Sequence, residues 1–96
     1  MGTYNNSTHT FYIRKGFPKL EKLQIDTYIP KTVKCIYMDN DVEVIGHHCF
    51  NNFRDIEEIK LSNNLQEIGL SSFWGHKLKH IDLPLSLKKI CNGAFQ

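Results

Sequence analysis

The chain carries apolar side chains at intervals that repeat along its length. The segment 56–61 reads apolar-x-x-apolar-x-apolar, and the segments 33–38 and 78–83 share this pattern at offsets of 23 and 22 residues. Successive side chains of an extended segment face opposite ways, so the apolar positions two residues apart share one face. Each of these first blocks therefore predicts a short strand with one buried face.

A second apolar block follows each first block and runs apolar-x-x-Ile, with a phenylalanine five residues after the isoleucine. These second blocks are 42–45, 65–68 and 87–90. Gly46 and Gly69 follow the first two blocks, and Cys91 takes this position in the third. Glycine adopts backbone angles that other residues avoid, so these positions predict a sharp turn with an unusual backbone angle.

A repeat of roughly 20 to 29 residues with this pattern is typical of a leucine-rich solenoid. One coil cannot bury its apolar face alone, but stacked coils bury it in continuous ladders. The predicted fold is a right-handed leucine-rich-repeat solenoid of about four coils, with short parallel strands and little helix. The predicted ladders are Ile36, Ile59 and Ile81; Met38, Leu61 and Leu83; and Phe50, Phe73 and Phe95.

The register before residue 33 is harder to assign. Leu20, Leu23 and Tyr28 stand 22 residues before Val42, Ile45 and Phe50 and indicate a degenerate earlier copy. Phe11 and Ile13 indicate a first strand of uncertain register. The segment 29–33 also resembles 83–87, so a competing frame remains open.

We expect a single leucine-rich-repeat domain over residues 1–96. Its expected parts are an irregular N-terminal cap or degenerate repeat at 1–32, repeats at 33–55 and 56–77, and an incomplete repeat at 78–96.

The order of these residues resembles the BspA-type leucine-rich repeat of bacterial and protist surface proteins. The best copy runs from Ile56 to Phe73, and Leu83-Pro84 matches the proline that follows the strand in that family. A small residue precedes each phenylalanine, as the family prefers. These small residues are Cys49, Ser72 and Ala94. The resemblance covers roughly residues 33–96 and implies a binding or adhesion surface without catalysis.

Composition narrows the classes of partner. Of the 96 residues 41% are hydrophobic and 23% are charged, and the formal net charge is +2. Such a balanced charge excludes an electrostatic nucleic-acid footprint, and no apolar run is long enough to enter a membrane as a span. Three cysteines are too few for a disulfide framework. The cellular location stays open, because the resemblance suggests a cell surface whereas the polar start without a signal peptide and the unpaired cysteines suggest an intracellular protein.

The outward positions of the predicted strands form a candidate binding surface, which we call the strand face. If the isoleucines and their partners point inward, the residues between them point out, with Lys60 beside Asp82 and Glu58 beside His80. Such a face is either solvated, with its opposite charges paired across the strands, or a surface that contacts a protein partner. Tyr37 is the expected anchor because tyrosine joins apolar area to a polar tip. The candidate residues of the strand face are Tyr37, Asp39, Glu58, Lys60, His80 and Asp82, with Ser62 also expected to point outward.

The last predicted coil has no following coil to cover its ladders. We call this the open end, and its residues are Leu83, Leu87, Ile90 and Phe95. Solenoids need polar caps, and two explanations of the open end stay open. Either the chain is a fragment of a longer array whose next coil covers this end, or the end pairs with another copy of the chain.

No residue pattern supports catalysis, a cofactor or a metal. The sequence His47-His48-Cys49 holds zinc-ligand types, but adjacent residues rarely aim at one ion, and Cys49 aligns with the small positions of the other copies. Three hypotheses follow: a non-enzymatic protein-binding module that uses the strand face, a unit that self-associates through the open end into a homo-oligomer, or an intracellular regulator of an enzyme such as a phosphatase.

Overall fold

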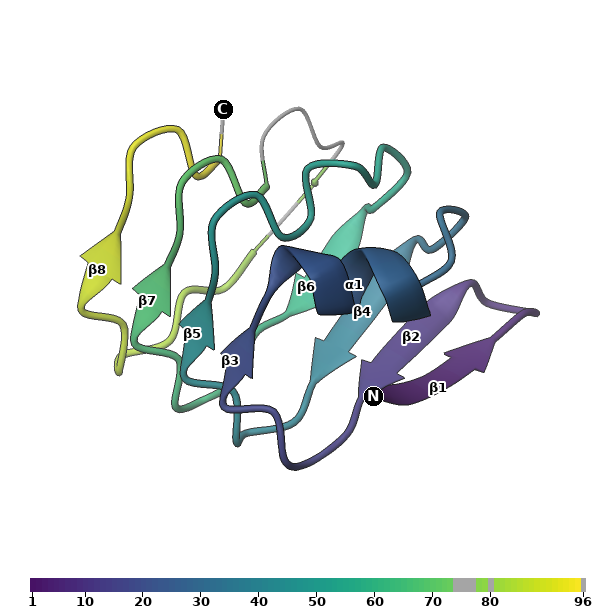
Figure 1. Ribbon diagram of the computed structural model, residues 1–96, viewed down its shortest axis with the longest axis horizontal. Coiled ribbons are helices and arrows are strands. Elements are labelled where there is room, and N and C mark those ends of the chain that lie inside the picture. The colour runs from purple at the N-terminus through teal and green to yellow at the C-terminus, as the bar shows by residue number, and fades with distance from the viewer. Residues whose placement is uncertain (74–77, 80, 96) are drawn as a thin grey trace.

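Two sheets of short strands run along the molecule and share one interior (Figure 1). The computed structural model describes residues 1–73, 78–79 and 81–95. The first sheet, here called the face sheet, has the order β1 (Gly2–Asn5), β2 (Thr10–Ile13), β4 (Cys35–Met38) and β6 (Glu58–Lys60). The second sheet has the order β3 (Lys19–Leu20), β5 (Val44–Ile45), β7 (Glu67–Ile68) and β8 (Lys89–Ile90).

The chain passes from one sheet to the other in successive coils, so each strand lies beside its equivalent in the next coil. β2, β4 and β6 are parallel, and so are β3, β5, β7 and β8; β1 alone is antiparallel to its neighbour among these strands of the described chain. The only helix among the described residues is α1 (Lys22–Tyr28). The predicted solenoid of parallel strands with little helix is therefore confirmed.

The predicted ladders form the core. Ile36 pairs with Ile59 across β4 and β6, and Ile45 pairs with Ile68 across β5 and β7; all four side chains are buried. The phenylalanine ladder is a stack of near-parallel rings. Its centroids are 5.4 Å apart between Phe50 and Phe73 and 5.3 Å apart between Phe73 and Phe95. This burial of apolar surface is the main source of stability for stacked coils.

The predicted register of the earliest copy is wrong. Leu20 pairs with Ile45, not Val42, and the first coil is 25 residues long from this position to the next. Ile25 is buried at the position that phenylalanine holds in later coils, whereas Leu23 and Tyr28 are exposed. The cause is α1, which replaces the tight turn of the later coils and takes up more chain.

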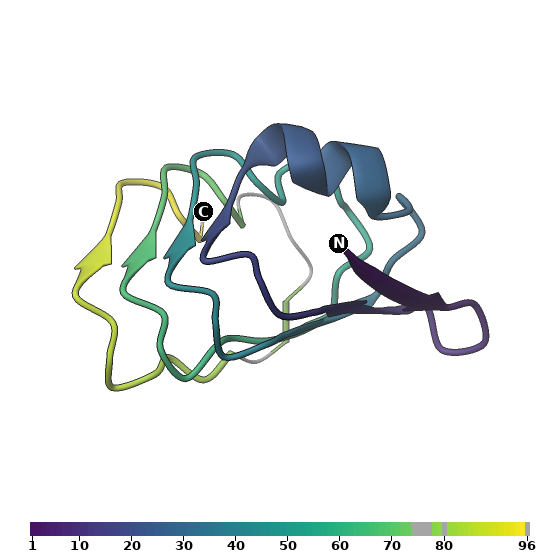
Figure 2. The same ribbon diagram turned by 60° about the horizontal axis from the view of Figure 1, so that its bottom comes forward.

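The first strand predicted from Phe11 and Ile13 is β2, where these residues pair with Ile36 and Met38. No strong sequence signal marks β1 or α1. At the start of α1, the amide of Glu21 donates to the Gln24 side chain at 3.1 Å, but glutamate is not a usual N-cap residue. Figure 2 shows α1 on the side of the molecule opposite β1 and β2, where it covers the first coil.

The two glycines have a different role from the predicted one. The left-handed backbone angles occur two residues later in each coil, at His48, Ser71 and Gly93, with φ of 61°, 52° and 69°. Gly69 is needed because a β-carbon there would lie 2.7 Å from the carbonyl carbon of Gly46. The glycines thus allow close approach between neighbouring coils.

The predicted third strand of the face sheet is not formed in the described part of 78–83. Lys79 donates its amide to the carbonyl of Glu57 at 3.3 Å, but residues 78–79 and 81–84 are not strand. Ile81 is half-buried and Leu83 is exposed, so the ladders loosen here. The last coil keeps its strand in the second sheet, where β8 pairs with β7.

Replacing Gly69 with alanine is expected to lower the free energy of unfolding by about 1–3 kcal/mol, the usual cost of overpacking. The new methyl group meets backbone atoms, which cannot rotate away. Denaturant unfolding of Gly69→Ala beside Cys91→Ala measures this. Cys91 is the equivalent position in the last coil and already carries a side chain, so its replacement should change stability much less. Equal effects would contradict the close-approach explanation.

Candidate functional site

The exposed side of the face sheet carries an aromatic pair beside a lysine. Tyr12, Tyr37 and Lys60 lie in register on β2, β4 and β6. The rings of Tyr12 and Tyr37 meet edge to face with their centroids 5.4 Å apart. Because the parallel strands pair in register, these three side chains point to the same face of the sheet. The two tyrosine rings form a fixed apolar surface there, which we call the platform.

A hydrogen bond ties Tyr37 to the next strand. Its hydroxyl donates to Oε1 of Glu58 at 3.1 Å. This bond, together with the negative charge of Glu58, raises the pKa of Tyr37. The phenol therefore stays protonated at neutral pH and keeps Glu58 turned toward the aromatic pair.

A hollow of about 720 Å³ lies next to this pair, between β6 and the first segment of the last coil. Tyr37, Glu58 and Lys60 line one side. Its other lining residues include Lys79, Ile81, Asp82, Leu83 and Pro84. The hollow exists because the segment 81–84 does not join the face sheet as a strand.

Both signs of charge border the hollow. Nζ of Lys79 lies 3.5 Å from Oε1 of Glu57, and both side chains are exposed. Lys60 and Asp82, predicted to be neighbours, both line the hollow. The surface thus combines apolar area with donors and acceptors of both charges, a mixture that suits a protein contact.

The other predicted residues of the strand face have different outcomes. Asp39 is half-buried, and its side chain accepts a hydrogen bond from the amide of Asp41 at 3.1 Å. His80 lies outside the described residues. Ser62 does not point outward: it is buried, and its hydroxyl donates to the carbonyl of Asn40 at 3.1 Å. The alternation fails there because β6 ends at Lys60.

Sequence reasoning missed Tyr12 as part of the strand face. Its alternation with the buried Phe11 and Ile13 is the signal that marks it as an outward residue. The uncertain register of this strand prevented its placement beside Tyr37.

The thiol of Cys49 is buried, as its alignment with Ser72 and Ala94 predicted. It donates to the carbonyl of Leu20 at 3.2 Å, and burial raises its pKa to about 12. Ser72 occupies the same slot one coil later, with Oγ 2.9 Å from the carbonyl oxygen of Gly46. A thiol of this kind stays protonated at neutral pH and packs as a small core side chain.

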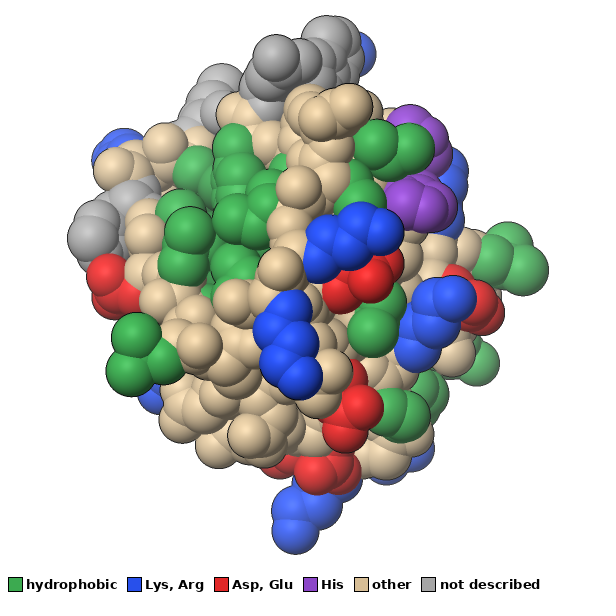
Figure 3. Space-filling view, turned by 90° about the vertical axis from the view of Figure 1, so that its left-hand side faces the viewer, with side chains coloured by type: hydrophobic (Ala, Val, Ile, Leu, Met, Phe, Trp, Pro, Cys, Tyr) green, Lys and Arg blue, Asp and Glu red, His purple; other side chains and the backbone are tan. Residues whose placement is uncertain are grey.

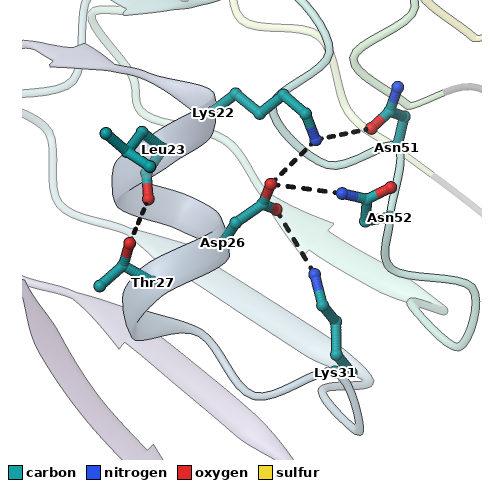
Figure 4. A network of polar contacts seen from close by, with 7 residues as sticks. All are labelled: Lys22, Leu23, Asp26, Thr27, Lys31, Asn51 and Asn52. Atoms are coloured by element: carbon teal, nitrogen blue, oxygen red, sulfur yellow. Dashed lines mark hydrogen bonds and ion pairs between the residues drawn. The ribbon is translucent and has the colours of Figure 1, made fainter.

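A second polar cluster joins α1 to the turn of the next coil (Figure 4). Asp26 accepts from Nζ of Lys22 at 2.9 Å, from Nδ2 of Asn52 at 3.2 Å and from Nζ of Lys31 at 3.5 Å. Burial alone raises the pKa of Asp26, but the two lysines outweigh it, and the net pKa is lowered. Lys31 also lies over the ring of Phe53, with Nζ 4.5 Å from the centroid.

This cluster, which we call the clamp, joins α1 to the next coil through Asp26 and is not arranged as a reaction centre. Both carboxylate oxygens of Asp26 are engaged, and its lowered pKa makes it a poor general base. Within the described residues, no three His, Cys, Asp or Glu side chains come together as a metal site. The same part of the chain holds no helix long and apolar enough to cross a membrane.

The repeats show which protein family the chain belongs to. Residues 21–96 match the family model of the BspA type leucine rich repeat region, so the chain belongs to this family. Leucine-rich repeats of this kind are protein-interaction modules, and the family is generally non-enzymatic. No curated protein and no solved structure matches the chain.

The clamp predicts a pH-dependent contribution to stability. The pKa of Asp26 is lowered by folding, so its stabilising contribution is present above the unfolded pKa of about 4 and is lost as the pH falls through the folded value. Asp26→Asn should lower the free energy of unfolding by roughly 1 kcal/mol at pH 7, with the difference from wild type shrinking below about pH 4.

Denaturant titrations between pH 7 and pH 3 measure this difference. Glu43→Gln is the control, because it also neutralises a carboxylate and its side chain is exposed on another coil. A deficit of Asp26→Asn that stays constant down to pH 3 would show that the carboxylate's charge is not what holds α1.

Proposed function

We propose that this chain binds a protein partner through its strand face and that it performs no catalysis itself. The observation that carries the proposal is the hollow between β6 and the segment 81–84, lined by Tyr37, Glu58 and Lys60. It gives the strand face a concave part, and protein contacts concentrate their binding energy where a side chain of one partner fills such a depression on the other.

The platform of Tyr12 and Tyr37 supports the same proposal. Aromatic side chains with polar tips are enriched in protein interfaces and lose little conformational entropy when a partner binds. The ring contact and the bond to Glu58 fix the position of Tyr37 before a partner arrives. Such preorganisation reduces the cost of binding.

The finer roles depend on the identity of the partner. Adhesion is the role that the family resemblance implies, and its partner would be a protein outside the cell. Regulation of an enzyme such as a phosphatase would use an intracellular partner. Both roles place the partner on the same residues, so identification of the bound protein separates them.

A second candidate function is self-association through the open end. It is favoured by the exposure of Leu83, Ile90 and Phe95, whose equivalents in the preceding coils are buried in the core ladders. Exposed apolar patches of this kind mark interaction sites.

The strand-face proposal is tested by affinity capture from an extract of the cells that express the protein, followed by titration of the captured protein in purified form. Tyr37→Ala removes the anchor and Lys60→Glu reverses a charge at the hollow. Each should weaken the partner's binding at least tenfold, which corresponds to about 1.4 kcal/mol.

Matched controls lie away from the strand face. Tyr28→Ala removes an exposed tyrosine from α1, and Lys88→Glu reverses an exposed charge beside the second sheet. Both should bind like the wild type, and circular dichroism should show all four variants folded. Unchanged affinity in Tyr37→Ala and Lys60→Glu would exclude the strand face as the binding site.

A further inference from the structure

Three neighbouring strands of the face sheet carry the platform and a carboxylate beside it. Tyr12 on β2 pairs with Tyr37 on β4. The carboxylate belongs to Glu58 on β6, the strand that pairs with β4 on its other side. These strands lie between β1 and the last coil, so their outward side chains form the face of a sheet and not an end of the solenoid. Figure 3 shows a different part of the surface, the end of the molecule beside β8, where hydrophobic side chains also gather.

The two rings of the platform stand nearly at right angles. Their planes meet at 75° and their centroids are 5.4 Å apart, so the edge of one ring faces the other. Tyr12 is 43% exposed and Tyr37 is half-buried, so the pair is held in place and is still open to solvent. The face of an aromatic ring is negative and attracts a cation that lies within about 6 Å of its centroid.

Glu58 adds a full negative charge next to the rings. Its Oε1 accepts a hydrogen bond from the hydroxyl of Tyr37 at 3.1 Å. An ionised carboxylate has about four acceptor positions on its two oxygens, and this bond uses one of them. Within the described residues, it is the only bond that the carboxylate makes. The other acceptor positions can therefore receive N–H donors from a partner.

Negative charge dominates at this point of the strand face. The hydrogen bond to Glu58 and then the charge of Glu58 are the main causes that raise the pKa of Tyr37. Lys60 is in register with Tyr37 but does not reverse this direction. Among the described residues, the cation that lies over an aromatic ring is Lys31, over Phe53. In that part of the chain, the rings of the platform therefore have no lysine or arginine over them.

We propose that the platform and Glu58 bind an arginine side chain of the partner. The guanidinium lies against the tyrosine rings and donates to the carboxylate, and the methylene stem of the arginine covers apolar ring area. This inference rests on the proposed function, the binding of a protein partner by the strand face, and names the side chain that this face selects.

Arginine fits this arrangement better than lysine or an acidic side chain does. Its planar guanidinium stacks on aromatic rings and presents several N–H donors at once, which suits a carboxylate with vacant acceptor positions. An ammonium group is a compact and more strongly hydrated charge, so it loses more solvation against a ring. An acidic side chain would meet the like charge of Glu58, which is unfavourable.

The test is a titration of N-acetyl-arginine amide into the full chain at constant ionic strength, followed through the backbone amide signals by nuclear magnetic resonance. N-acetyl-citrulline amide is the matched probe, because citrulline has the length and shape of arginine but a neutral urea group. We expect arginine amide to shift the signals of Tyr12, Tyr37 and Glu58. It should bind about fivefold more tightly than citrulline amide, a ratio that matches an exposed cation–π contact.

Two variants separate the charge from the rings. Glu58→Gln removes the charge but keeps an oxygen that can accept from Tyr37, and its preference for arginine over citrulline should fall at least about twofold. Tyr12→Leu removes an exposed ring and should weaken arginine binding by a similar factor. Glu43→Gln is the matched control, because it removes an exposed carboxylate beside the second sheet, and it should keep the full preference. Circular dichroism checks that all three variants are folded.

Three outcomes overturn the inference. Equal shifts from arginine and citrulline amides, or no shift from either, show that the platform does not select a cation. Equal binding of N-acetyl-lysine amide shows that the charge alone is recognised and not the guanidinium. Tighter binding of N-acetyl-glutamate amide than of arginine amide shows that Lys60, and not Glu58, sets the preference of this surface.

These outcomes are distinguishable from a failure of the proposed function. If Tyr37→Ala weakens the binding of the captured partner but arginine amide does not bind, the strand face still binds a partner and only the inference about arginine falls. If the partner binds Tyr37→Ala as it binds the wild type, the proposed function falls, and the inference falls with it.

Discussion

The structure depends on the close stacking of each coil against its neighbours. No coil of 22 to 25 residues can enclose its own apolar side chains, and each one buries them between the coils on either side. Gly69 shows how tight this stacking is, since a β-carbon there would lie 2.7 Å from the carbonyl carbon of Gly46. The small slot of Cys49, Ser72 and Ala94 reflects the same constraint, because it also lies between neighbouring coils.

The strand face and the open end both follow from this stacking. In-register strands align Tyr12, Tyr37 and Lys60 on one surface without any dedicated loop. Where stacking weakens in the last coil, the segment 81–84 leaves the face sheet, and the hollow appears beside β6. In the same coil, Leu83, Ile90 and Phe95 are exposed. The two candidate surfaces are thus consequences of one repeated packing unit and its interruption.

The sequence alone was sufficient to predict the ladders, because their apolar spacing recurs with little variation from residue 33 onward. It was insufficient before that point, since α1 lengthens the first coil and Ile25 replaces the diagnostic phenylalanine. The role of Gly69 could not be predicted from the sequence either, because its contact with Gly46 depends on how two coils pack against each other. The outward placement of Tyr37 needed only alternation, whereas its bond to Glu58 and the adjoining hollow needed coordinates.

Hydrogen exchange of individual amides tests most directly whether neighbouring coils supply the stability. Gly46, Gly69 and Cys91 donate equivalent amide bonds to the preceding coil, at 2.8, 2.8 and 2.9 Å. Their bond lengths are alike, but the ladders beyond Cys91 are accessible. At concentrations where the chain is monomeric, Gly46 and Gly69 should exchange only through global unfolding, and Cys91 should exchange much faster through local opening. Equal protection of all three amides would contradict the account.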